Sequence, residues 1–118
     1  MTALAALIAK LEAATEGSRE LDFAIRLVDE EPGTKIDGRF AELVPRYTTS
    51  LDAALTLVPA DPKGGWYWRV GHSSLYRGWA HLNRYHPDNC DTGDETSANA
   101  ATPALALCMA ALRARMGK

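Results

Sequence analysis

The sequence predicts an α+β fold, in which a small antiparallel sheet packs with about four helices in an α/β/α-like sandwich. Two observations predict this class. Ala and Leu dominate several segments with helical spacing, whereas all three Trp residues fall within one short alternating segment that favours a β-hairpin. The length of 118 residues suits one core, so we expect residues 1–118 to form a single domain.

Two helices are predicted in the first quarter of the chain. A first helix is expected from about Thr2 to Thr15, followed by a second helix that Ser18 can cap. Asp22 and Arg26 stand four residues apart in the second helix, and we expect them to pair on its solvent-exposed side. The apolar stripes of the two helices are Leu4, Leu7, Ile8 and Leu11 in the first, and Leu21, Ala24, Ile25 and Val28 in the second.

The next segment predicts a loop and then a third helix. Thr34 to Arg46 has no clear period, and we expect mostly loop there, with a short helix at Phe40 to Val44. Thr49, with Asp52 three residues later, has the spacing of a capping box, and Pro59 ends the helix that follows. The apolar stripe of this helix is Leu51, Ala54, Leu55 and Val58.

A β-hairpin is predicted from about residue 66 to residue 85. Trp66 to Val70 alternates and is rich in aromatic residues, which favours a strand; Gly71 to Ser74 has turn chemistry, and Leu75 to Tyr85 can return as the second strand. Gly78 lies inside this returning strand, where a glycine is typical of a bulge or of a close approach between backbones.

The C-terminal part predicts a polar loop and a buried helix. His86 to Asn99 is polar and is expected to be an exposed loop, with a third short strand near Glu95 to Ala98 as the alternative. Thr102 and Pro103 are favoured at the start of a helix, and Ala104 to Leu112 is apolar at every position. We expect this last helix to pack against a sheet on one side and against helices on another.

Composition restricts the location and the partners. A formal charge of −2 gives no overall field that would attract nucleic acid or an anionic membrane. The apolar run from Ala104 to Leu112 is much shorter than the roughly 20 residues that span a bilayer. No basic region precedes the apolar N-terminal stretch, so no signal peptide is expected. We therefore expect a cytoplasmic location, reduced thiols and no membrane partner.

No motif that supports catalysis is complete. His81, His86 and Cys90 could ligate a metal, but the second closely spaced pair of ligands typical of zinc sites is missing. The acidic segment from Asp88 to Glu95 lacks the ligands that a calcium loop requires. Cys108 lies in an apolar helix, where a thiol packs as a small hydrophobic group. We predict no enzyme, no catalytic residue, no cofactor and no metal.

The hairpin carries the candidate interaction residues. Alternation places Trp66, Trp68 and Val70 on one face, and we expect that face to pack on the helices. The opposite face is interpreted as an exposed platform, because Arg and aromatic residues are enriched at protein interfaces and on surfaces that bind single-stranded nucleic acid. The residues of this platform are Tyr67, Arg69, Arg77, Trp79 and His81.

Several strings of the sequence, in this order, resemble the small phage and prophage proteins grouped as the phage ABA sandwich domain. They are Ser18 to Asp22, Tyr47 to Pro59, Trp68 to Val70, Gly78 to Ala80 and Thr102 to Arg115. The resemblance implies a three-layer arrangement with a small sheet between helices, and an origin in a phage or an integrated prophage, hence a location in a bacterial host cell. The family has no established activity, so the resemblance implies no site residues.

Three functions follow as hypotheses. The first is a non-catalytic protein-interaction module that binds another protein or a second copy of itself through the platform or an unpaired strand edge. The alternative is a nucleic-acid-binding accessory protein, with Arg69, Arg77 and Arg84 on phosphates and Trp side chains stacked on bases. A metal-dependent enzyme that uses His81, His86 and Cys90 is the least favoured.

Overall fold

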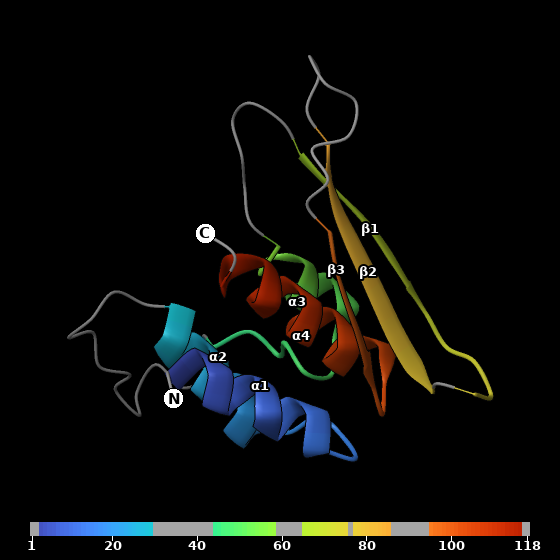
Figure 1. The fold of residues 1–118 in the computed structure, drawn as a ribbon. Helices are drawn as coiled ribbons and strands as arrows, with labels where there is room; N and C mark the ends of the chain where they lie inside the picture. Colours follow the sequence, from blue (N-terminus) through green and yellow to red (C-terminus); the bar gives the residue numbers. More distant parts are fainter. Residues whose placement is uncertain (1–2, 30–43, 59–64, 76, 86–94, 117–118) are drawn as a thin grey trace.

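The computed structural model confirms the predicted α+β class: a small antiparallel sheet packs with four helices in the part of the chain that it describes (Figure 1). It describes residues 3–29, 44–58, 65–75, 77–85 and 95–116. The elements are α1 (Ala3–Ala13), α2 (Arg19–Asp29), α3 (Leu51–Leu55), β1 (Gly65–Gly71), β2 (Gly78–Tyr85), β3 (Glu95–Ala100) and α4 (Pro103–Met116). The short helix expected at Phe40 to Val44 lies outside the described residues, apart from Val44.

The sheet has three antiparallel strands in the order β1-β2-β3. Leu82 of β2 stands opposite Trp68 of β1 and opposite Thr96 of β3, so side chains of even number share one face of the sheet. That face packs on the helices, since Ala80, Leu82 and Ala98 are buried. The alternation predicted for the hairpin therefore holds, and the second strand begins at Gly78 rather than at Leu75.

The third strand corrects the prediction of an exposed loop up to Asn99. β3 has few residues that favour strands, which is why its sequence resembles a polar loop. Pairing with β2 along its whole length satisfies the backbone groups of β3 that face β2, and Ala98 is small enough to be buried between the sheet and the helices. Tertiary packing thus decides the structure here, and the alternative of a short strand is confirmed.

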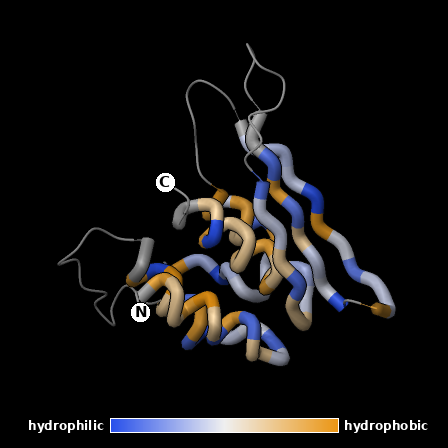
Figure 2. Tube along the Cα trace, in the orientation of Figure 1, coloured by the Kyte–Doolittle hydropathy of each residue, from blue (hydrophilic) through white to orange (hydrophobic). Residues whose placement is uncertain are grey.

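Helix α4 occupies the centre of the molecule, as its apolar sequence predicts. Every residue from Ala104 to Leu112 is buried, and Figure 2 shows hydrophobic residues over most of the helix. The sheet packs on one side of α4, while α1 and α3 pack on its other sides, and α2 packs on α1 (Figure 1). In the described part of the chain, the layers are therefore sheet, α4 with α3, and α1 with α2.

Thr102 and Gly78 explain how the N-terminal end of α4 packs on the sheet. Thr102 caps α4, and its Oγ1 accepts a hydrogen bond from the backbone N of Leu105 at 3.2 Å. Gly78 of β2 lies directly against this cap, since a Cβ atom at Gly78 would stand 2.1 Å from the carbonyl carbon of Thr102. The predicted close approach at Gly78 is thus confirmed, and it seats the first turn of α4 on the sheet.

The third helix is shorter than predicted and is capped one residue later. Ser50, not Thr49, is the N-cap, and its Oγ accepts from the backbone N of Ala53 at 3.3 Å. The one-turn helix buries Ala54, and the turn after it buries Leu57, while Leu51 remains exposed. The predicted stripe was wrong at Leu51 because the helix begins just there and is too short to keep a regular apolar face.

The solvent-side position predicted for Asp22 is wrong, because this carboxylate lies in a buried polar junction. Its Oδ1 accepts from the backbone N of Thr48 at 2.8 Å and from the Thr48 hydroxyl at 2.7 Å. Its Oδ2 accepts from Arg19 at 3.0 Å, and Arg19 also donates to the carbonyl oxygen of Val44. Asp22 is fully buried, so these bonds compensate the cost of removing its charge from water. The junction fastens residues 44–48 to the start of α2.

None of the described helices has the length and apolar character needed to cross a membrane.

The substitution Asp22→Ala is expected to destabilise the fold by about 3 kcal/mol, because it leaves the buried amide and hydroxyl of Thr48 without their acceptor. Urea unfolding followed by circular dichroism measures the change. Glu20→Ala is the matched control, since Glu20 lies in the same first turn of α2 and is exposed. A loss in Asp22→Ala no larger than in the control would contradict the structural role of the junction.

Candidate functional site

Four of the five predicted platform residues share the face of the sheet that points away from α4. Arg69 of β1 stands opposite His81 of β2, Trp79 stands opposite Gly71, and Tyr67 stands opposite Asn83. We call this surface the outer face; it consists of Tyr67, Arg69, Trp79 and His81, extended by Asn83 and by Glu95, Ser97 and Asn99 of β3. In the described part of the chain all helices lie on the other side of the sheet, so no described helix covers it (Figure 1).

Arg77, the fifth predicted residue, lies at the end of the sheet and not within a strand. It precedes β2, forms an isolated bridge with Ala100, and has a positive φ of 42°. Positive φ is uncommon for a residue that carries a Cβ atom, and it marks the turn in the backbone that leads into β2. Arg77 is exposed, so its charge is available next to the outer face.

Trp79 is held in place on the outer face by a glycine on the neighbouring strand. A Cβ atom at Gly71 would stand 2.5 Å from Cζ2 of Trp79, so the indole ring lies over the bare backbone of Gly71. This cross-strand contact explains why Trp79 is half-buried on a face that has no described helix over it. The indole ring is therefore packed against the sheet itself.

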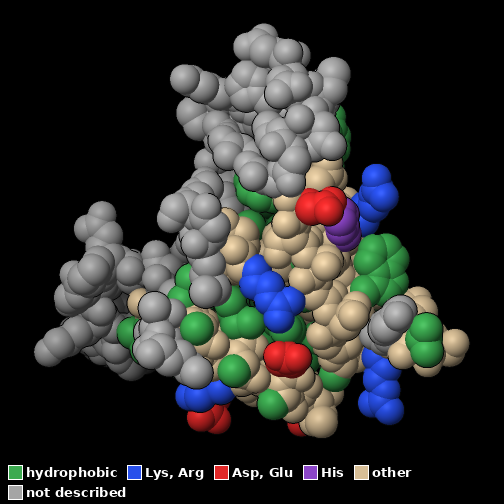
Figure 3. Space-filling view, in the orientation of Figure 1, with side chains coloured by type: hydrophobic (Ala, Val, Ile, Leu, Met, Phe, Trp, Pro, Cys, Tyr) green, Lys and Arg blue, Asp and Glu red, His purple; other side chains and the backbone are tan. Residues whose placement is uncertain are grey.

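The outer face carries both signs of charge. Nε2 of His81 lies 3.7 Å from Oε2 of Glu95, and both groups reach solvent. Figure 3 shows a histidine and an acidic side chain side by side on this part of the surface. An exposed pair at this distance contributes little to stability. Glu95 also offsets part of the positive charge that Arg69 brings to the same face.

Strand β1 extends beyond the helices, and this leaves an aromatic side chain exposed on each of its faces. Helix α4 packs chiefly on β2 and β3. Trp66 is half-buried and packs against the core, whereas Trp68 is 49% exposed on the same face. Tyr67 is 55% exposed on the outer face. The expectation that Trp68 packs on the helices is therefore wrong, because its strand lies at the edge of the sheet, where the helical layer no longer covers it.

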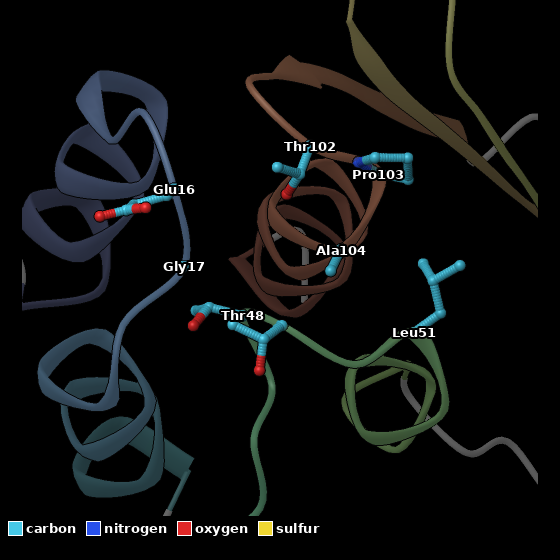
Figure 4. Close-up of a pocket in the computed structure, with 8 residues that line it drawn as sticks. Glu16, Gly17, Thr48, Leu51, Thr102, Pro103 and Ala104 are labelled. Atoms are coloured by element: carbon cyan, nitrogen blue, oxygen red, sulfur yellow. The ribbon is translucent and has the colours of Figure 1, made fainter.

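A hollow of about 410 Å³ lies at the N-terminal end of α4 (Figure 4). The Thr48 and Thr102 hydroxyls that line it already have partners in Asp22 and in the backbone of Leu105. Of the residues that line it, Glu16 alone carries an ionisable side chain, so the hollow offers no pair for acid–base chemistry. Its lining residues are Glu16, Gly17, Thr48, Thr49, Leu51, Thr102, Pro103 and Ala104.

The residues considered for metal or nucleophilic chemistry do not form a centre in the described part of the chain. No group of three or more His, Cys, Asp and Glu residues is close enough there to hold a metal ion. His86 and Cys90, and the side chain of Arg84, lie outside the described residues. Cys108 is free and buried, and its Sγ donates to the carbonyl oxygen of Tyr47 at 3.2 Å. Burial, together with the nearby charge of Asp22, raises the pKa of this thiol well above its ordinary value.

Comparisons with protein-family models, with curated proteins and with solved structures found no match. The outer face and the edge strand β1 are thus characterised by their own geometry.

We expect Cys108 to resist thiol reagents such as Ellman's reagent in the folded protein near neutral pH, and to react once guanidinium unfolds the chain. The reason is that the neutral thiol is favoured by burial, while the thiolate is the reactive form. Because the thiolate forms more readily after unfolding, this group also favours unfolding as the pH rises through about 9. Peptide mapping assigns the label to Cys108 or to Cys90. Equal labelling of Cys108 before and after unfolding would contradict the buried position.

Proposed function

We propose that this protein is a non-catalytic protein-interaction module that binds its partner through the outer face and the adjoining edge strand β1. The observation that carries the proposal is the exposure of β1, which presents Tyr67 on one face and Trp68 on the other, about half of each side chain in solvent. Exposed aromatic residues on an edge strand are unfavourable in an isolated protein, and they are typical of surfaces that become covered on binding.

The chemistry of the outer face supports a protein partner. Tyr, Trp and Arg are the residues that most often contribute strongly to binding at protein interfaces. Trp79 is already ordered over Gly71, and Arg69 stands beside His81 across the strand pair. A rigid aromatic group with a neighbouring cation offers both apolar contact and charge-assisted hydrogen bonds. The side of β1 that points away from β2 adds a strand edge on which an extended segment of a partner can pair.

A nucleic-acid partner is the weaker alternative. Arg69, Arg77 and the aromatic residues could contact phosphates and bases. However, Glu95 places a negative charge beside His81 on the same face, and the chain as a whole carries a formal charge of −2. Binding of this kind would weaken steeply as salt is added, which distinguishes it from a protein contact dominated by aromatic side chains.

The origin in a phage or an integrated prophage is part of the proposal and rests on the resemblance to the phage ABA sandwich domain alone. Genes that neighbour this one in its genome test the origin directly. Genes for phage structure, replication or regulation are the expected neighbours, and a neighbourhood of host metabolic genes would contradict it.

Photo-crosslinking in the cells that express the protein tests the proposed function. We expect p-benzoylphenylalanine in place of Tyr67 to yield crosslinks to protein, because this exposed position lies on the proposed binding surface. Gel electrophoresis and mass spectrometry identify the crosslinked species, and treatment with nuclease shows whether any of them contains nucleic acid.

The matched control carries the same photoreactive residue in place of Glu12, which is exposed on α1, away from the sheet. Protein crosslinks from position 67 that are absent from position 12 support the proposal. Crosslinks to nucleic acid alone would favour the alternative, and equal crosslinking from both positions would show that the outer face has no special role.

A further inference from the structure

We propose that the partner of β1 is β1 of a second copy of this chain, paired antiparallel across a two-fold axis. Two three-stranded sheets would then join into one continuous sheet, with the helices of both copies on the same side. This inference rests on the proposed function, for which it names the partner. The arguments are the position of β1 at the edge, the two-fold pattern of its sequence, and the apolar surface that pairing would cover.

Of the two edges of the sheet, β1 is the one left open by the described residues. β3, the other edge, lies closer to the helices, because both α4 and α1 contact it. Arg113 of α4 also donates to the carbonyl oxygen of Ser97 on β3 at 2.9 Å. A side chain therefore already occupies an acceptor on β3. β1 has seven residues, from Gly65 to Gly71, and no strand of the described residues lies on its outer side.

The sequence of β1 is complementary to itself about Trp68. With a two-fold axis at this residue, each position of one copy stands opposite the position at equal distance on the other side of the axis. The pairs are Trp68 with Trp68, Tyr67 with Arg69, Trp66 with Val70, and Gly65 with Gly71, each joining one copy to the other. All seven residues are then paired: Gly65 faces Gly71, Trp66 faces the aliphatic Val70, and the cationic Arg69 faces the aromatic ring of Tyr67.

Each face of the joined strands gains from this register. On the helix side, the two Trp68 rings cover each other, which removes from water the apolar surface that each leaves half exposed. On the outer face, the guanidinium of Arg69 approaches the ring of Tyr67 from the other copy, a favourable cation–π arrangement. Moving the axis to Arg69 would place two like charges directly opposite each other. Moving it to Tyr67 would leave two residues of each strand unpaired.

The helices leave room for this arrangement. Because α4 packs chiefly on β2 and β3, the two copies of α4 would be separated by about four strand spacings, or ~19 Å. Packed helices approach to about 8–10 Å, so the gap can hold the side chains of Trp66 and Trp68 from both copies. The contact is small for a protein interface, and we therefore expect a reversible dimer whose population depends on concentration.

Sedimentation velocity over a range of protein concentrations tests the inference. The weight-average mass of the wild-type protein is expected to rise from 12.8 kDa toward twice that value as concentration increases. Trp68→Glu places two carboxylates opposite each other at the axis and is expected to raise the dissociation constant about 30-fold or more. Leu75→Glu is the control, because Leu75 is 76% exposed and lies outside β1. It should leave the dimer intact.

Cysteine crosslinking checks the register, with Cys90→Ser as the background. Cysteine introduced at position 68 is expected to form a disulfide-linked dimer rapidly under mild oxidation, whereas cysteine at position 75 is not. Circular dichroism verifies that each variant is folded. A wild-type protein that is monomeric at every concentration, or a Leu75→Glu variant that loses the dimer as fully as Trp68→Glu, would overturn the inference. If the protein is monomeric but position 67 still crosslinks to other proteins, the dimer is refuted and the proposed function stands.

Discussion

The arrangement of the molecule depends on the need to cover helix α4 on every side. Nine consecutive apolar residues, from Ala104 to Leu112, give this helix no polar side that could face water. The sheet covers one side and the other helices cover the rest, so the helices of the described residues all gather on one face of the sheet. In the described part of the chain, the opposite face is then left to the polar and aromatic residues of the strands.

Three contacts hold α4 and its neighbouring elements in this arrangement. The absence of a side chain at Gly78 lets the cap of α4 lie directly on β2. On the far side, Asp22 and Thr48 join α2 to the segment that leads into α3, and Tyr47 of this segment accepts a bond from Cys108 of α4. The carboxylate of Asp22 and the thiol of Cys108 are thus both buried and hydrogen-bonded within the fold. Their contribution is to hold neighbouring segments together.

Much of this fold can be predicted from the sequence, because local signals and final structure agree in most elements. The caps at Ser18 and Thr102, the glycine at Gly78 and the alternation of the hairpin all have a direct local cause. β3 and Asp22 could not be assigned in the same way. A strand of small polar residues gains its stability from its neighbours, and a charged residue on an amphipathic helix gives no sign of the distant backbone that it will bind.

The residues that share the outer face could be predicted from the sequence, but the exposure of the edge strand could not. Alternation fixes which residues of the hairpin share a face, so Tyr67, Arg69, Trp79 and His81 come together as expected. Which strand lies at the edge, and how far the helices reach, depends on the position of α4 across the sheet. This is why the exposure of Trp68 could be seen only in the structure.

In the proposed dimer, β1 is the part of the molecule that contacts a second copy of the chain. Amide hydrogen exchange of the segment Trp66 to Val70, measured at low and at high protein concentration, tests it most directly. In the dimer, these amides are expected to exchange more slowly at high concentration, while those of α1, from Leu7 to Leu11, exchange at an unchanged rate. Exchange of the β1 amides at the same rate at every concentration would contradict it.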